Sequence, residues 1–111
     1  MTIRVQPREF IVSNVTTIIT ASGGLTVTHN LMRIASDGGS VNITANPQIS
    51  PGNYDGQSLI ILGTSDINNV IFENGDGLSM SASVTVGNKD FLFYRWGVNE
   101  NEWIMKGSDT K

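Results

Sequence analysis

Apolar and hydroxyl-bearing residues alternate strictly over residues 78–86, with an apolar side chain at every even position and Ser or Thr at every odd one. Successive side chains of a strand point to opposite faces, so this pattern predicts a β-strand with one apolar and one polar face. Turns rich in Gly, Asn and Asp separate further short runs of this kind. We expect additional strands at residues 25–31, 41–44, 57–62, 70–72, 91–96 and 103–106.

The strands recur every 8–12 residues or so, and no window has the spacing of an amphipathic helix. The pattern predicts an all-β fold of many short antiparallel strands, arranged as a sandwich, a barrel or a β-helix-like stack. We expect an extended N-terminal arm over residues 1–10, because Pro7 cannot donate a ladder hydrogen bond. Residues 11–111 then form a single domain, and any subdomain joint falls in the break at residues 46–56, which holds two prolines.

Residues 10–21 are dense in β-branched side chains and lack clean alternation. Such a strand needs cover on both faces, which a small domain supplies with difficulty on its own. The segment is therefore a candidate subunit interface, or else it forms two ordinary short strands interrupted at Ser13 and Asn14. The candidate interface residues are Ile11, Val15, Ile18 and Ile19.

Composition excludes several classes of protein. The chain has 111 residues and no cysteine, which excludes a disulfide framework, thiol catalysis and cysteine-ligated zinc. No stretch approaches the roughly 18 apolar residues of a membrane-spanning helix, and the first residues lack the features of a signal peptide. We expect a protein made in the cytoplasm without export.

Charge is distributed unevenly, with a positive balance up to Ser36 and a negative balance from Asp37 onward. Three scattered arginines do not form the basic cluster that a nucleic-acid binder needs, so we expect neither nucleic acid nor membrane as a partner. The split suits a weakly basic arm that docks on a protein, although chance placement of few charges explains it equally well. The candidate docking residues are Ile3, Arg4, Val5, Arg8 and Phe10.

Few residues point to catalysis or metal binding. His29 is the only histidine, and we expect it to be a hydrogen-bonded inward or interface residue. The acidic turns at residues 66–69 and 73–77 offer oxygen atoms to calcium, but they lack the spacing of a calcium loop, and side chains that bond their own backbone explain them more simply. We therefore expect no enzyme activity, catalytic residue, metal or cofactor.

Five aromatic residues are concentrated near the C-terminus: Phe91, Phe93, Tyr94, Trp96 and Trp103. An exposed aromatic platform would suit the stacking of a sugar ring. The simpler interpretation is cross-strand packing of Trp96 with Trp103 across the turn between them.

The chain from Asn46 onward resembles a β-module of tailed-bacteriophage virion proteins, found in tail fibres, head fibres and related spikes. The resemblance covers roughly residues 46–109, and Asn53 and Tyr54 depart from it by lengthening the first break. The residues that carry it are Ile49-Ser50-Pro51-Gly52, Asp55-Gly56-Gln57-Ser58-Leu59, Ile61-Leu62-Gly63-Thr64-Ser65-Asp66, Val70-Ile71-Phe72-Glu73-Asn74-Gly75-Asp76-Gly77-Leu78, Gly87-Asn88-Lys89-Asp90, and Trp103 with Gly107-Ser108-Asp109.

This resemblance implies a non-enzymatic structural protein of a virion that is completed by trimerisation. The first expectation is a capsid decoration protein, which stabilises the shell from outside and contacts the major capsid protein or another virion protein. The alternative is a tail-fibre or head-fibre domain that binds carbohydrate on the host surface. The short chain favours the first, because it leaves little length for both a tail anchor and a shaft.

Overall fold

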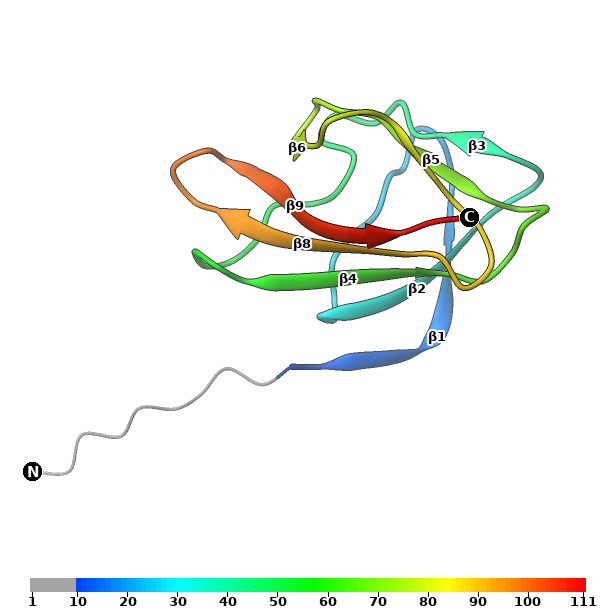
Figure 1. Ribbon diagram of the computed structural model, residues 1–111, viewed down its shortest axis with the longest axis horizontal. Helices are drawn as coiled ribbons and strands as arrows, with labels where there is room; N and C mark the ends of the chain where they lie inside the picture. The colour runs from blue at the N-terminus through cyan, green and yellow to red at the C-terminus, as the bar shows by residue number, and fades with distance from the viewer. Residues whose placement is uncertain (1–9) are drawn as a thin grey trace, which may run out of the picture.

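A computed structural model describes residues 10–111, in which nine strands form two sheets (Figure 1). These residues contain no helix, and hence none long and apolar enough to span a membrane. The prediction of an all-β fold is confirmed. The strands are β1 (Val12–Ile19), β2 (Leu31–Ser36), β3 (Val41–Asn42), β4 (Ser58–Gly63), β5 (Val70–Phe72), β6 (Leu78–Ser79), β7 (Val84–Val86), β8 (Phe91–Gly97) and β9 (Glu102–Asp109).

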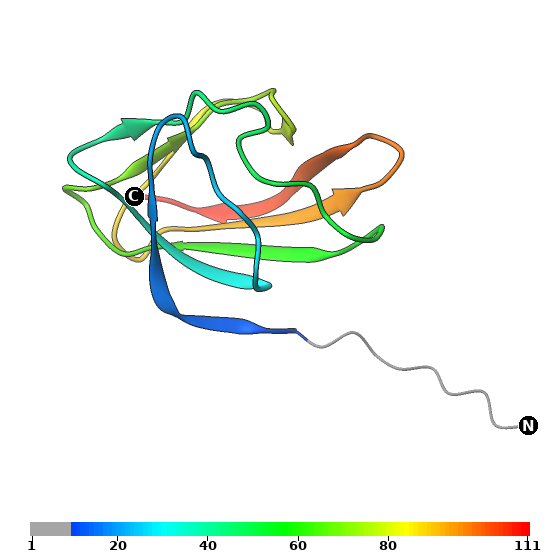
Figure 2. The same cartoon turned by 180° about the vertical axis from the view of Figure 1, so that it is seen from behind.

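The larger sheet has the strand order β1-β2-β4-β8-β9-β6, and the smaller sheet has the order β3-β5-β7. The two sheets form two layers, which Figure 2 shows from behind. The prediction that the strands are antiparallel is wrong for four of the pairs, namely β1–β2, β2–β4, β3–β5 and β6–β9. Both sheets are therefore mixed.

The parallel pairs β2–β4 and β3–β5 arise because the chain crosses from one sheet to the other between successive strands. It runs from β2 in the larger sheet to β3 in the smaller one, and then repeats this step from β4 to β5. Leu31 pairs with Ile60 and Val41 pairs with Val70, so the offset along the chain is the same in both sheets. Parallel neighbours need such a crossover, which a two-residue hairpin cannot supply.

One hydrophobic core contains residues from both sheets and from the break at residues 46–56. Ile43, Ile49 and Leu59 belong to the same cluster, so this break crosses a shared core. In strand β4, successive side chains alternate between the core and the outer side of the sheet. Leu59 and Ile61 are fully buried, whereas Ile60 and Leu62 are half-exposed.

Gln48 ties the break at residues 46–56 to the turn at residues 73–77. Its side chain is almost completely buried; Oε1 accepts a hydrogen bond from Glu73 N at 2.8 Å, and Nε2 donates to Glu73 O at 2.6 Å and to Gly75 O at 2.9 Å. The backbone N–H of Gln48 donates to Asp76 O. A single buried amide thus satisfies backbone groups that no strand ladder reaches.

The predicted single strand at residues 78–86 is divided into two strands that belong to different sheets. Leu78 in β6 pairs with Trp103 in β9, whereas Val86 in β7 pairs with Val70 in β5. The small, exposed residues 81–83 carry the chain between the sheets. The alternation correctly identifies Leu78 and Val86 as buried, but it contains no information about which sheet each end joins.

The predicted strand at residues 25–31 forms only one isolated bridge, from Leu25 to Ile49. The Asn30 side chain replaces part of a ladder, because it accepts a hydrogen bond from Ile11 N and donates one to Ser58 O, each at 2.8 Å. These contacts bend the chain immediately before β2, which begins at Leu31.

Candidate functional site

Strand β1 lies at the edge of the larger sheet and pairs with one strand, β2 (Figures 1 and 2). Large apolar side chains are exposed along it, with exposed fractions from 44% to 72%. They form the β1 strip: Phe10, Ile11, Val12, Val15 and Ile18. No residue of β1 is charged, so the strand lacks the charged side chains that commonly protect a free sheet edge from pairing with another chain.

A bulge in β1 explains why apolar residues on this strand remain outside the core. Val12, Val15 and Ile18 are three positions apart, so a regular strand would turn them to alternate faces, yet all three are exposed. The pairing register with β2 shifts between Val12 and Thr16. Ser13 Oγ donates to Val15 O within the bulge, and Arg33 Nη1 donates to Ser13 O from β2.

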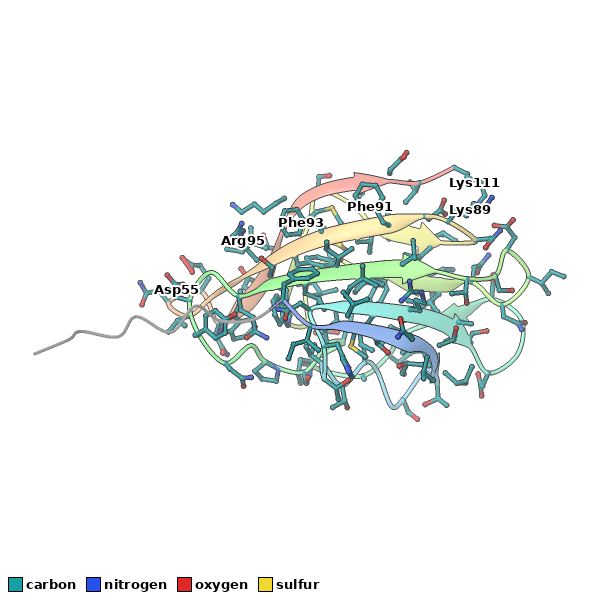
Figure 3. All side chains as sticks on the ribbon, turned by 90° about the horizontal axis from the view of Figure 1, so that it is seen from below. Asp55, Lys89, Phe91, Phe93, Arg95 and Lys111 are labelled. Carbon is teal, nitrogen blue, oxygen red and sulfur yellow. The ribbon has the colours of Figure 1, made fainter. Side chains whose placement is uncertain are left out.

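A second apolar area lies on the side of the larger sheet that faces away from the smaller sheet. Leu31, Ile60 and Phe93 are consecutive partners across β2, β4 and β8, and Leu62 pairs with Phe91 beside them. All five are half-exposed or exposed, and we call them the outer face. Figure 3 looks onto this side and shows Phe91 and Phe93 along β8.

Two arginines are the charged residues on this side of β2, β4 and β8. Arg33 pairs with Leu62, and Arg95 follows Phe93 on β8 (Figure 3). The guanidinium carbon of Arg95 lies 5.6 Å from the centre of the Phe93 ring, and its Nη1 donates to Gly56 O at 3.1 Å. Because Arg carries apolar surface and stacks on aromatic rings, this side is suited to contact with another protein.

The structure allows some of the predicted site residues to be placed. Of the candidate docking residues, Ile3, Arg4, Val5 and Arg8 lie outside the described residues, and Phe10 is 50% exposed at the start of the β1 strip.

Among the candidate interface residues, Ile11, Val15 and Ile18 are exposed, whereas Ile19 is fully buried. Ile19 belongs to the core of its own chain and not to the surface, because the alternation at the end of β1 turns it toward the interior.

The two tryptophans pack against each other, as predicted. Trp96 pairs with Trp103 across β8 and β9, and their rings meet edge to face with centres 5.2 Å apart. Trp103 Nε1 donates to Ser50 O at 2.9 Å. Since Trp96 is 6% exposed and Trp103 is 0% exposed, neither ring offers a free face to a sugar.

Asp66, in one of the two acidic turns considered for calcium, has a structural partner, as does Asp90 beside it. Lys111 Nζ lies 2.8 Å from Asp66 Oδ1 and 3.2 Å from Asp90 Oδ1. Hydrogen bonds from Lys111 and from Asn88 N hold the pKa of Asp66 below its usual value. Burial raises the pKa of Asp90, but hydrogen bonds from Gly87 N and Lys111 outweigh it and leave that pKa lowered.

The asparagines of these turns bond to the backbone or to a nearby hydroxyl. Asn68 Oδ1 accepts a hydrogen bond from Gly39 N, and Asn69 Nδ2 donates to Asp66 O. Within residues 10–111, no group of three His, Cys, Asp or Glu side chains converges as metal ligands would.

Comparisons with models of protein families, with curated proteins and with solved structures gave no match for this chain. The functional inference therefore depends on the surface of the molecule itself. The described part of that surface has two adjacent apolar areas, the β1 strip and the outer face, and both are poor in charge.

Proposed function

We propose that this protein is a non-enzymatic capsid decoration protein of a tailed bacteriophage, which forms homotrimers on the outside of the shell. It is made in the host cytoplasm and contacts sister copies and the major capsid protein or another virion protein. The observation that carries the proposal is the β1 strip, a set of exposed apolar side chains on an uncharged edge strand.

Burial of the β1 strip stabilises an assembly of several copies. Full burial of one Val, Ile or Phe side chain contributes about 1.5–3 kcal/mol. Because the five side chains are 44% to 72% exposed, their further burial contributes roughly half of that amount each, on the order of 4–8 kcal/mol in total, which offsets the lower part of an association cost on the order of 4–15 kcal/mol. The free edge of β1 also offers backbone donors and acceptors to a neighbouring strand.

Two different apolar areas on one chain favour a cyclic assembly. When the same patch meets itself, the contact is isologous and gives a dimer, whereas contact between two unlike patches is heterologous and gives a ring when the rotation between copies closes. In the proposed trimer, the β1 strip of each copy packs against the outer face of the next. The resemblance of residues 46–109 to trimeric virion modules supports the same number of copies.

Residues 1–10 are proposed to dock on the shell. Ile3 and Val5 lie two positions apart, so an extended chain presents them on one side, with Arg4 on the other. The segment joins the β1 strip directly at Phe10. A shell contact would therefore be continuous with the contact between copies.

The number of copies is tested by sedimentation equilibrium. We expect a mass of three chains for the wild type and of one chain for a Val15→Ser, Ile18→Ser variant with an unchanged circular dichroism spectrum. Ile67→Ser is the matched control, since Ile67 is 82% exposed in a turn far along the chain from β1, and it should remain trimeric. A wild-type mass of one chain would contradict the proposal.

Attachment to the shell is tested by incubating purified protein with undecorated capsids and counting bound copies. Deletion of residues 1–7 should abolish binding while the trimer stays folded. Ile3→Ser with Val5→Ser should weaken it, because the apolar side of the arm is lost. Unchanged occupancy would exclude the arm, and imaging that places the protein on the tail would favour the fibre alternative.

A further inference from the structure

A groove of about 270 Å³ lies where residues 27–30, residues 53–57 and the start of the β1 strip meet. Asp55, in the same turn as the groove residues Asn53 and Tyr54, marks this end of the larger sheet in Figure 3. The lining residues are Ile11, Val27, Thr28, His29, Asn30, Asn53, Tyr54 and Gln57.

Gln57 brings an unpaired amide donor to this groove. The residue is only 7% exposed, and its Oε1 accepts a hydrogen bond from Asn53 N at 2.5 Å, which fixes the orientation of the amide. Within residues 10–111, its Nε2 has no hydrogen-bond partner. Among the described residues no buried side-chain nitrogen or oxygen lacks a partner, so this N–H is open to the groove, where an acceptor of a ligand can receive its hydrogen bond.

His29 contributes a second polar group. Its ring is half-buried, and Nδ1 lies 2.8 Å from Thr28 Oγ1. Among the described residues, Nε2 of His29 has no hydrogen-bond partner. Depending on the tautomer, Nε2 donates to a ligand or accepts from it. The groove thus presents hydrogen-bonding groups from two separate segments of the chain.

The lining also indicates the charge and shape of the ligand. Within residues 10–111, it contains no carboxylate, ammonium or guanidinium group, so an anion or a cation would find no opposite charge on these residues. Ile11 and Val27 supply apolar surface, and Tyr54 supplies an aromatic ring. Neutral hydroxyl groups on a ring with an apolar side match this combination, since aromatic rings with a polar end suit such amphipathic ligands.

We propose that the groove binds one ring of a neutral sugar. Its volume is close to the lower limit of small-molecule pockets, about 300–1,000 Å³, so a single ring fits and a long chain does not. Gln57 Nε2 donates to a hydroxyl oxygen, His29 bonds a second hydroxyl, and the apolar side of the ring packs on Tyr54. This site is separate from the tryptophan pair and does not rest on the proposed function.

Saturation-transfer NMR tests the proposal with the methyl glycosides of glucose, galactose and N-acetylglucosamine. We expect at least one of them to bind the full-length protein in the millimolar range. Gln57→Glu and His29→Ala should each weaken that binding about five- to tenfold, the effect of one lost hydrogen bond. Gln57→Glu replaces the Nε2 donor but retains the Oε1 that accepts from Asn53 N, so the turn stays intact.

Asn99→Ala is the control, because Asn99 is exposed in the loop between β8 and β9 and should leave binding unchanged. The titration is repeated on the Val15→Ser, Ile18→Ser variant, so that a neighbouring copy over Ile11 cannot hide the groove. The proposal is overturned if neither protein binds any of the three glycosides, if the groove variants bind as well as the wild type, or if methyl glucuronide binds more tightly than methyl glucoside. None of these results changes the sedimentation mass that tests the trimer.

Discussion

Strands β1 and β8 are both rich in large apolar residues, yet those of β1 are mostly exposed to solvent whereas the inward residues of β8 are buried. β8 lies between β4 and β9, and its inward residues Leu92, Tyr94 and Trp96 are buried. β1 has one neighbour, and most of its large apolar side chains are exposed. The difference lies in the regularity of the backbone, because burial alternates from Phe91 to Trp96 along β8 and so separates a core side from an outer side, whereas the bulge interrupts this alternation in β1.

This comparison shows which part of the molecule is complete within one chain. The inward side of β8 is covered by side chains of the same chain, which come from the smaller sheet and from β9. The β1 side has its apolar residues outside, so their burial requires another molecule. Substitutions on the inward side of β8 should therefore lower the free energy of unfolding. Substitutions in the β1 strip should instead change the number of copies in the proposed assembly.

The largest expected effect is on the covered side, from Trp103→Ala. The substitution removes a fully buried ring, the contact with Trp96 and the hydrogen bond to Ser50 O. We expect the free energy of unfolding to fall by about 3–5 kcal/mol, measured by urea denaturation. Trp103→Phe is the control and should lose less, since most of the apolar volume remains. A loss below about 1 kcal/mol for the alanine variant would contradict the assigned packing.

Two adjacent residues of β1 sharpen the comparison within a single strand. Ile19 is fully buried and Ile18 is 58% exposed. In the Val15→Ser background, chosen to weaken the proposed assembly, Ile19→Ala should cost about 2–5 kcal/mol of unfolding free energy and Ile18→Ala less than about 0.5 kcal/mol. Equal losses in urea denaturation would show that the inward and outward sides of β1 have been assigned wrongly.

The smallest expected effect concerns the C-terminal end of the described chain, where Lys111 bonds Asp66 and Asp90. Both carboxyl groups have pKa values below their usual 3.8 in the folded protein. The unfolded chain therefore takes up these protons at higher pH than the folded one. The resulting stability is present above about pH 4 and is lost as the pH falls through the lowered values.

Lys111→Met should make the acid dependence of the thermal midpoint shallower, because the pKa values of Asp66 and Asp90 then rise toward normal. Lys106→Met is the matched control, since Lys106 is exposed on β9 and makes no ion pair with a described residue. Its acid profile should follow that of the wild type. Identical profiles for the two variants would exclude the contacts of Lys111 with Asp66 and Asp90 as the origin of the effect.

Local pattern predicted the strands well where a segment has one apolar face and a clear turn at each end. The strand at residues 70–72 is confirmed without change, the strand at 57–62 is shifted by one residue, and the pairing of Trp96 with Trp103 follows from the short turn between them. These features depend on neighbours in sequence, which a reading of periodicity detects.

Features that depend on distant partners were missed. Nothing in residues 78–86 reveals that Leu78 joins β9 while Val86 joins β5. Parallel pairing was also missed, since it depends on how the chain crosses between the sheets. The groove combines Gln57 with His29, which lie on different segments, and the strong turn composition at residues 51–56 was the one sign in the sequence that polar side chains gather there.

The anchoring of Gln48 has a consequence for digestion by proteases. Residues 46–50 have no strand of their own, yet Gln48 and Ile49 are almost completely buried and bonded to distant segments. Cleavage requires several residues to detach and enter the active site of a protease, so this irregular segment should survive brief digestion. Within residues 10–111, the first cut should fall instead in an exposed loop, at residues 37–40 between β2 and β3 or at residues 98–101 between β8 and β9, each with four consecutive exposed residues.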